Sequence, residues 1–269
     1  MEKCKTCSAQ ASPFSKATVL GRYEVAYYRC DECGFVQTED PYWLEEAYSN
    51  AITASDIGLV SRNMRLSLLT MSLIRLCFNP AGKFLDHAGG YGLLVRLMRD
   101  AGYDFHLYDK YCKNIFAPGF GVAEGENGCY DLVTAFEFLE HTRDPLEELR
   151  RILCRSRNIL FTTEIHPASV PFPEDWWYYG LEHGQHISLF TLKSLGILAG
   201  KLSLNFYTNG TSIHLFTEKQ LPPFLFNLAL KYPIASLLKL LCRRPSFLAR
   251  DFEAVRYHSS PSDSEDRGR

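Results

Sequence analysis

The 269-residue chain has little net charge and no long apolar run. Its 29 basic and 31 acidic residues leave a formal charge of −2, without the basic excess that is usual in a bulk nucleic-acid binder. No 18 consecutive residues are all apolar, so we expect no transmembrane helix. Polar sequence follows Met1–Cys4 directly, which predicts no signal peptide and a cytoplasmic location. The 46% hydrophobic content favours a folded core over disorder.

Two nucleotide-binding fingerprints are incomplete in the glycine-rich segment 84–92. The lysine of a phosphate-binding loop is missing, and Leu93 stands where G-x-G-x-x-G needs its third glycine. A short apolar strand, 83–87, precedes the segment and a helix, 93–101, follows it. Glycines at such a place let a cofactor approach the backbone closely, although a plain turn is the alternative. The pattern that remains is D-x-A-x-G-x-G, formed by Asp86, Ala88, Gly90 and Gly92.

An acidic residue follows this loop at a distance that is typical of a ribose-binding carboxylate. Asp109 ends a second predicted strand, 105–109, and lies 23 residues after Asp86. A carboxylate at the end of that strand can accept hydrogen bonds from both ribose hydroxyls of an adenosyl group. A strand-terminal Asp in an ordinary turn is the alternative. The loop and the acid together favour cofactor binding.

Strands and helices alternate from residue 83 onward, which predicts a doubly wound α/β sheet with helices on both faces. A late antiparallel hairpin turns at Asn209-Gly210. The predicted strands are 83–87, 105–109, 130–136, 158–163, 204–208 and 212–216. The predicted helices are 93–101, 145–153 and 191–201, and Asp144-Pro145 opens the second of them. Residues 42–78 are also helical in pattern, with a helix that Ser55-Asp56 can cap.

Nine cysteines are present, and four of them form Cys4-x2-Cys7 and Cys30-x2-Cys33. Disulfides are not the default in a reducing compartment. Two such pairs, on a hairpin of extended runs 23–28 and 35–38, can give one zinc ion four thiolates. Because four cysteines leave no open coordination position, we expect a structural zinc site. A redox pair is the alternative.

Residues 175–192 are rich in aromatics and histidine. Trp176, Trp177, Tyr178 and Tyr179 stand in a row. The segment follows the strand 158–163, so it should lie beyond the carboxyl ends of the strands, where ligands bind. Aromatic faces can stack on a sugar or base, and His183 or His186, with near-neutral pKa, can accept a proton. A lid in which Trp176 and Trp177 cover the core, with histidines that only hydrogen-bond to the backbone, is the alternative.

Residues 83–217 resemble the class I S-adenosylmethionine-dependent methyltransferases. The loop is similar to their first motif, usually (D/E)-x-G-x-G-x-G, with Ala88 in place of the first glycine. The segment 130–146, which contains F-E-F-L-E-H, resembles a further motif and implies that Glu137 contacts the cofactor. In similar ubiquinone-type O-methyltransferases an E-x-x-E-H can hold a divalent ion, which makes Glu137, Glu140 and His141 a possible second metal site. The family's usual third strand is not evident between residues 109 and 130.

The stretch 183–192 resembles the Y-H-E-H-L-S-Y-F-S-L motif of zinc-containing sugar C-methyltransferases, which also carry an N-terminal cysteine-rich module. In that group the second histidine is a general base, and it aligns with His186. His183, Gly184 and Gln185 depart from the motif. The resemblance implies methyl transfer to a sugar or a nucleotide-linked sugar, with His183 as the main competitor for the base. Alternatives are a protein or nucleic-acid acceptor presented by the zinc module, and a methyltransferase fold that only binds ligands.

The sequence divides into five expected regions. The segment 221–244, with leucines beside Lys231, Lys239, Arg243 and Arg244, can form a basic amphipathic helix at a membrane surface. A helix that covers the sheet or another subunit is the alternative, and we favour it. The expected regions are a zinc-binding module (1–40), a helical linker and lid (41–82), a cofactor-binding methyltransferase domain (83–220), C-terminal helices (221–258) and a disordered tail (259–269).

Overall fold

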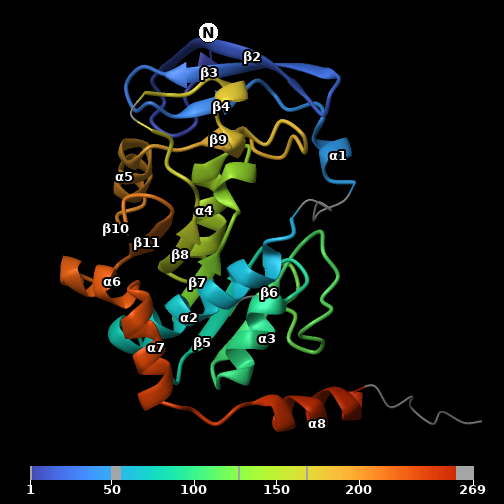
Figure 1. Ribbon diagram of the computed structural model, residues 1–269, viewed down its shortest axis with the longest axis vertical. Coiled ribbons are helices and arrows are strands. Elements are labelled where there is room, and N and C mark those ends of the chain that lie inside the picture. Colours follow the sequence, from blue (N-terminus) through green and yellow to red (C-terminus); the bar gives the residue numbers. More distant parts are fainter. Residues whose placement is uncertain (1, 50–55, 127, 168, 259–269) are drawn as a thin grey trace, which may run out of the picture.

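The computed structural model describes residues 2–49, 56–126, 128–167 and 169–258. The expected disordered tail 259–269 lies outside the described residues, as does Ser55, half of the expected Ser55-Asp56 helix cap. The structure contains two β-sheets, which lie at opposite ends of the molecule (Figure 1). One is the predicted α/β sheet, and the other is formed mainly by the N-terminal residues.

The α/β sheet has six strands in the order β10-β11-β8-β7-β5-β6. Strands β8, β7, β5 and β6 are parallel, and β11 pairs antiparallel with both β8 and β10. This is the predicted doubly wound sheet with a late antiparallel hairpin, so the fold class is confirmed. The strands are β5 (Lys83–His87), β6 (Asp104–Tyr108), β7 (Leu132–Ala135), β8 (Asn158–Thr162), β10 (Asn205–Thr208) and β11 (Ile213–Thr217).

Helices cover both faces of this sheet, as strand–helix alternation predicts. One apolar core lies under α2 (Leu59–Cys77), α3 (Leu93–Asp100), α6 (Pro223–Ala229) and α7 (Tyr232–Leu241). The opposite core lies under α4 (Pro145–Leu153) and α5 (Leu192–Lys201).

Side-chain hydrogen bonds cap the N-termini of α4 and α5. Asp144 accepts from the Glu147 amide at the start of α4, and Thr191 forms a capping box with Ser194 at the start of α5. The expected cap of α2 is wrong. Gly58 precedes the helix without a side-chain cap, and Asp56 instead forms two hydrogen bonds with Arg62.

The described part of the segment between β6 and β7, which leaves out residue 127, contains no third strand, as the sequence indicated. These described residues pair with the sheet through an isolated parallel bridge between Leu107 and Gly121. A Cβ on Gly119 would lie 3.3 Å from Val255 of α8 (Leu248–His258), so the C-terminal helix packs against this segment.

The N-terminal sheet contains the predicted hairpin but is larger than expected. Its order is β1-β2-β3-β4-β9, where β1 is Glu2–Lys3, β2 Gln10–Val19, β3 Tyr23–Cys30, β4 Val36–Thr38 and β9 Ser188–Leu189. Strand β2 contains Pro13 and a register shift between Pro13 and Ser15, which hides its alternation in the sequence. The fifth strand, β9, comes from the predicted acceptor segment.

Candidate active site

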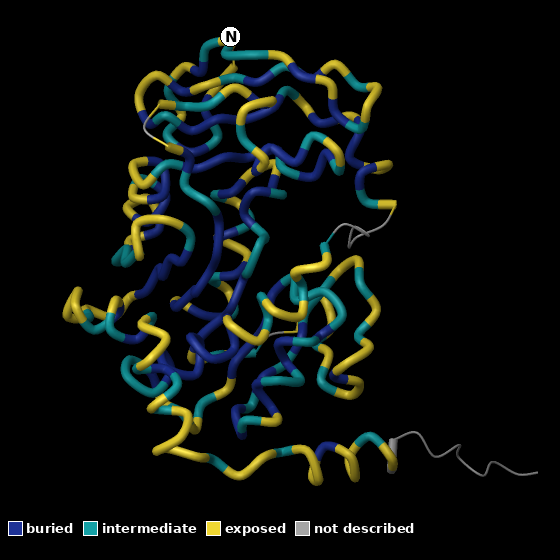
Figure 2. The backbone as a smooth tube through the Cα atoms, in the orientation of Figure 1, coloured by how far each residue is buried: buried dark blue, intermediate teal, exposed yellow. Residues whose placement is uncertain are grey.

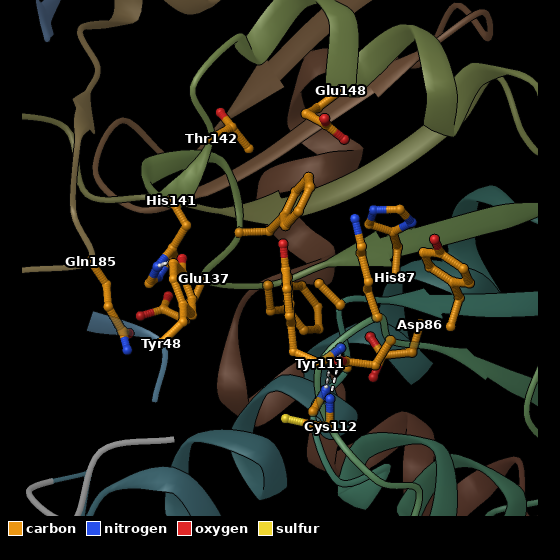
Figure 3. A pocket seen from close by; sticks show the side chains of 18 of the residues that line it. Tyr48, Asp86, His87, Tyr111, Cys112, Glu137, His141, Thr142, Glu148 and Gln185 are labelled. Carbon is orange, nitrogen blue, oxygen red and sulfur yellow. Dashed lines mark hydrogen bonds between the residues drawn. The ribbon is translucent and has the colours of Figure 1, made fainter. Parts of the chain in front are cut away.

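A cavity of about 1330 Å³ opens at the carboxyl ends of β5, β6 and β7. The glycine loop and the residues after β6 line one side of it. Residues 182–186 and α1 (Leu44–Ala47) line the other. Figure 3 shows Asp86 and His87 on the first side and Glu137, His141 and Tyr48 on the second. The predicted cofactor and acceptor segments therefore face one space.

The glycine loop requires unusual backbone angles. Ala88, Gly90 and Gly92 have φ of 56°, 60° and 85°, in the left-handed region that favours glycine. A Cβ on Gly89 would lie 2.2 Å from the Asp86 carboxylate. Gly90 and Gly92 belong to the sequence motif, and Gly89 is a further position where a side chain has no room.

Asp86 lies beneath the loop and is buried. Its Oδ1 accepts a hydrogen bond of 2.6 Å from the Thr134 hydroxyl of β7. Burial raises the pKa of Asp86 to about 7, with the nearby Asp109 carboxylate acting in the same direction. Asp86 therefore braces the loop from the sheet side.

Asp109 follows β6 and ties two loops together. Its Oδ2 accepts from the Gly90 amide at 2.8 Å, and its Oδ1 accepts from the amides of Tyr111 and Cys112 at 2.8 and 2.7 Å. A carboxylate has about four acceptor positions, so backbone contacts use most of them. The predicted ribose carboxylate is thus also an anchor for the glycine loop.

Glu137 follows β7 and also has a left-handed backbone, with φ of 49°. Its amide donates to the Thr162 hydroxyl at 2.8 Å, and that hydroxyl donates to the Glu137 carboxylate at 2.7 Å. Such strain in a non-glycine residue clusters at functional sites. Glu137 lines the cavity, and its contact with the cofactor stays a prediction.

His186 and His183 lie side by side, with ring centroids 4.9 Å apart. His186 Nδ1 lies 2.5 Å from the Tyr178 carbonyl oxygen. Because a carbonyl only accepts, the proton is on Nδ1 and Nε2 is left as the acceptor. His183 is the reverse, since its Nδ1 accepts from the Gln185 amide at 3.1 Å, which leaves Nε2 to donate.

Burial lowers the pKa of His186 to about 4, below the near-neutral value expected from the sequence. Burial also lowers the pKa of His183. Both rings are therefore neutral at pH 7.

Glu140 and His141 complete a cluster around His186. Tyr178 donates a hydrogen bond of 2.5 Å to Glu140 Oε1, while Glu140 Oε2 has no partner among the described residues. Burial, with the Glu137 charge, raises the pKa of Glu140 to about 8. Donor atoms of Glu140, His141 and His186 lie within 4.8 Å of one another, close enough to share a divalent cation. Compared with the expected second metal site, His186 takes the place of Glu137.

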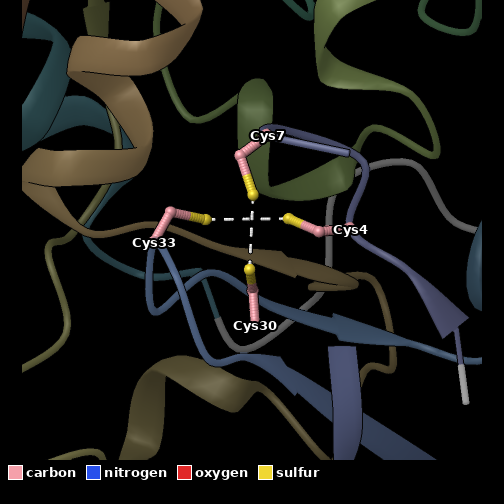
Figure 4. A group of neighbouring side chains, drawn as sticks. All are labelled: Cys4, Cys7, Cys30 and Cys33. Atoms are coloured by element: carbon pink, nitrogen blue, oxygen red, sulfur yellow. Dashed lines mark hydrogen bonds between the residues drawn. The ribbon is translucent and has the colours of Figure 1, made fainter. Parts of the chain in front are cut away.

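The four predicted cysteines converge in one cluster (Figure 4). Their sulfurs lie within 4.8 Å of one another, with 3.6 Å between Cys4 and Cys33 and 3.3 Å between Cys7 and Cys30. A tetrahedral zinc with Zn–S bonds of about 2.3 Å requires sulfurs about 3.8 Å apart. The donor set and its size therefore fit zinc.

Sequence reasoning missed how much of the N-terminal region borders the cavity. Tyr48, just after α1, holds His141 Nδ1 through its hydroxyl at 3.0 Å. Trp43 Nε1 donates to the Gly184 carbonyl, and Gln185 Nε2 donates to the Ala47 carbonyl, both at 2.8 Å. No local pattern marks Tyr48, because its role depends on a contact 93 positions away.

The row of aromatics is divided between two roles. Tyr178 and Tyr179 are buried in a core shared with the N-terminal sheet, and Trp176 packs against it. The lid alternative predicts that Trp176 and Trp177 cover the core. Trp177 is 74% exposed and lines the cavity.

Comparison with known proteins agrees with this fold. The model of a methyltransferase domain family matches residues 61–206, more than half of the chain, and the chain belongs to this family. Members of this class use S-adenosylmethionine as the methyl donor, as the sequence motifs implied. No curated protein matches the sequence.

Several solved methyltransferases are similar in structure. The methyltransferase CalO1 of calicheamicin biosynthesis, with SAH bound, is 18% identical with a TM-score of 0.44, and the match covers 67% of this chain and 60% of CalO1. An O-methyltransferase family protein from Burkholderia thailandensis is 12% identical with a TM-score of 0.47, covering 68% and 64%. Magnesium protoporphyrin IX methyltransferase from Synechocystis, with SAH bound, is 11% identical with a TM-score of 0.41, covering 66% and 95%. The match thus spans about three fifths of the first of these proteins.

Proposed function

We propose that the chain transfers a methyl group from S-adenosylmethionine to a small polar acceptor, a sugar or a nucleotide-linked sugar. One observation carries this proposal. The glycine loop with Asp109 and the segment with His183 and His186 line the same cavity. A donor held on one side can therefore meet an acceptor held on the other.

The donor side fits an adenosyl cofactor. The glycine loop lines the cavity, and Asp109 keeps an acceptor position for a ribose hydroxyl. The bound cofactor supplies an electrophilic sulfonium methyl. The protein then has to align the acceptor and remove its proton.

His186 is the general base in this proposal. Its proton on Nδ1 is held by the Tyr178 carbonyl, so Nε2 is free of a proton and can take one from the acceptor. His183 offers a donor instead, which suits it to orient an acceptor oxygen. Trp177, exposed at the cavity, supplies an aromatic face of the kind that sugars stack on.

Two further parts of the proposal concern the N-terminal region and the acceptor. We infer that Cys4, Cys7, Cys30 and Cys33 hold one structural zinc. A protein or nucleic-acid acceptor, and a binding module without catalysis, are the alternative functions. If isothermal titration detects no binding of S-adenosylmethionine, the chain is a binding module and not an enzyme. Because binding alone would not prove catalysis, the general base must also be tested.

Replacement of His186 by Asn tests the base, because Asn keeps part of the hydrogen bonding but cannot hold the proton. The acceptor is first identified by labelling a metabolite extract with methyl-labelled S-adenosylmethionine. We then expect turnover to fall about a hundred- to ten-thousandfold, the usual contribution of a general base, with unchanged affinity for S-adenosylhomocysteine.

The pH profile gives a second readout. A base must be unprotonated, so the wild-type rate should fall only as pH drops through about 4, the pKa of His186. His183→Asn is the matched control, and its rate should still fall as pH drops through about 4. Full activity of His186→Asn together with loss in His183→Asn would transfer the role to His183, and full activity of both would refute a histidine base.

A further inference from the structure

The C-terminal segment 219–250 has a charge opposite to that of the rest of the chain. It contains six of the 29 basic residues and none of the 31 acidic ones. Lys231, Lys239, Arg243 and Arg250 of this group are exposed. A chain with an overall charge of −2 therefore carries one locally cationic surface.

Helix α7 within this segment is apolar on two faces. Ala235 is buried where the helix packs against α2. Leu237, Leu240 and Leu241, spaced to share one helical face, are between 49% and 69% exposed. The first face covers the core, as the favoured interpretation of the sequence predicted, and the second face covers nothing in the described chain.

The elements before and after these leucines in the sequence expose further large apolar side chains. Phe224 of α6, Tyr232 at the start of α7, and Leu248 and Phe252 of α8 are each at least 56% exposed. Figure 2 shows exposed residues along these helices, at the end of the molecule away from the N-terminal sheet. Large apolar side chains exposed on three successive elements indicate an interaction site.

We propose that this surface, formed by α6, α7 and the segment leading into α8, binds the interface of an anionic lipid bilayer. Exposed leucine and aromatic side chains beside lysine and arginine are the pattern of an amphipathic helix that lies in the membrane plane. No single helix of the described residues is long and apolar enough to span a membrane. Helices α6 and α7 reach the necessary length and apolar character only when they are taken together, and a bend of 75° separates them. The inner face of this pair is already packed on α2.

Charge disfavours a second copy as the occupant. A two-fold contact through this surface would bring the same cations of two chains together, without an acidic residue between Glu218 and Asp251 to pair with them. An anionic bilayer matches both the charge and the apolar side chains.

Sedimentation of the full chain with lipid vesicles tests the proposal, which does not depend on the acceptor or on catalysis. We expect binding to mixed phosphatidylcholine–phosphatidylserine vesicles, weaker binding to phosphatidylcholine alone, and partial loss in high salt. Lys239→Glu with Arg243→Glu should weaken binding to the mixed vesicles about thirtyfold. Leu240→Ser with Leu241→Ser should weaken it on the order of a hundredfold.

Lys3→Glu with Lys16→Glu is the matched control, because it changes the net charge equally at exposed positions of the N-terminal sheet. This variant should bind vesicles as the wild type does. Circular dichroism and the midpoint of thermal unfolding check that each variant is folded. The proposal is overturned if the wild type binds neither vesicle, if the control loses as much binding, or if sedimentation equilibrium shows a dimer that the leucine variant abolishes.

Discussion

Asp109 illustrates how one carboxylate serves both ligand binding and loop geometry. The sequence predicted it from its place after a strand, and that place was correct. The structure adds three backbone amides that point at its two oxygens. These contacts hold the Gly90 turn against the turn after β6, so the cofactor side is preformed by the same group that is proposed to bind the ribose.

Replacement of Asp109 by Ala should therefore weaken binding of S-adenosylhomocysteine by about 2–4 kcal/mol, because charge-assisted hydrogen bonds to the ligand and to the loop are both lost. Asp109→Asn should lose less, since its Oδ1 can still accept from Tyr111 and Cys112. Isothermal titration measures both. Equal affinity of the alanine variant and the wild type would mean that the cofactor lies elsewhere.

At the level of elements, local signals predicted the α/β sheet well. Apolar runs bounded by turns placed β5 at 83–87, and Asp144-Pro145 placed the start of α4, because capping and strand burial are properties of a few neighbouring residues. Strand β2 escaped detection because Pro13 and a register shift interrupt its alternation. Strand β9 escaped because two residues pair with a partner far away in the sequence.

A buried ion pair joins helix α8 to α3. Asp251 accepts hydrogen bonds of 2.7 and 2.8 Å from Arg99 of α3, and both side chains are at most 3% exposed. Burial alone would raise the pKa of Asp251, but the hydrogen bonds from Arg99 lower it. The stabilisation is therefore present above the pKa of a free Asp and is lost as pH falls through the lower pKa of the folded state.

Asp251→Ala should reduce the free energy of unfolding by about 3 kcal/mol at pH 7, since a buried charge loses its main partner. Urea unfolding measures this, and the difference from the wild type should shrink in strong acid. Asp100→Ala removes the more exposed pair with Arg96 and should cost less than about 1 kcal/mol. Equal losses in the two variants would contradict the assigned role of Asp251.

For the molecule as a whole, the N-terminal sheet and the acceptor segment share a core and an edge strand. Tyr27 and Trp43 pack with Tyr178 and Ile187, and β4 pairs with β9. The sequence predicted the four cysteines and the two histidines separately. It could not show that the sheet that carries the cysteines packs against the segment that carries the histidines. Hydrogen bonds and packing between distant segments leave no spacing pattern in the sequence.

Loss of the proposed zinc site should therefore loosen the segment 183–191, which we propose faces the acceptor, and spare the glycine loop. In Cys30→Ser, we expect zinc content to fall and amide hydrogen exchange to rise in residues 183–191. Exchange in residues 86–92 and affinity for S-adenosylhomocysteine should stay near the wild-type values. Cys129→Ser, at an exposed position, is the control. A Cys30→Ser protein that lacks metal but keeps full protection in residues 183–191 would refute this coupling.

The pairing of β4 with β9 also sets an order on synthesis. The four cysteines leave the ribosome within the first 33 residues, so the proposed zinc site can close early. Its sheet then keeps β4 as an open edge until Ser188 and Leu189 emerge, about 150 positions later. An unpaired edge invites association with other chains. Nascent chains that stall before residue 188 should therefore be the species most in need of chaperones.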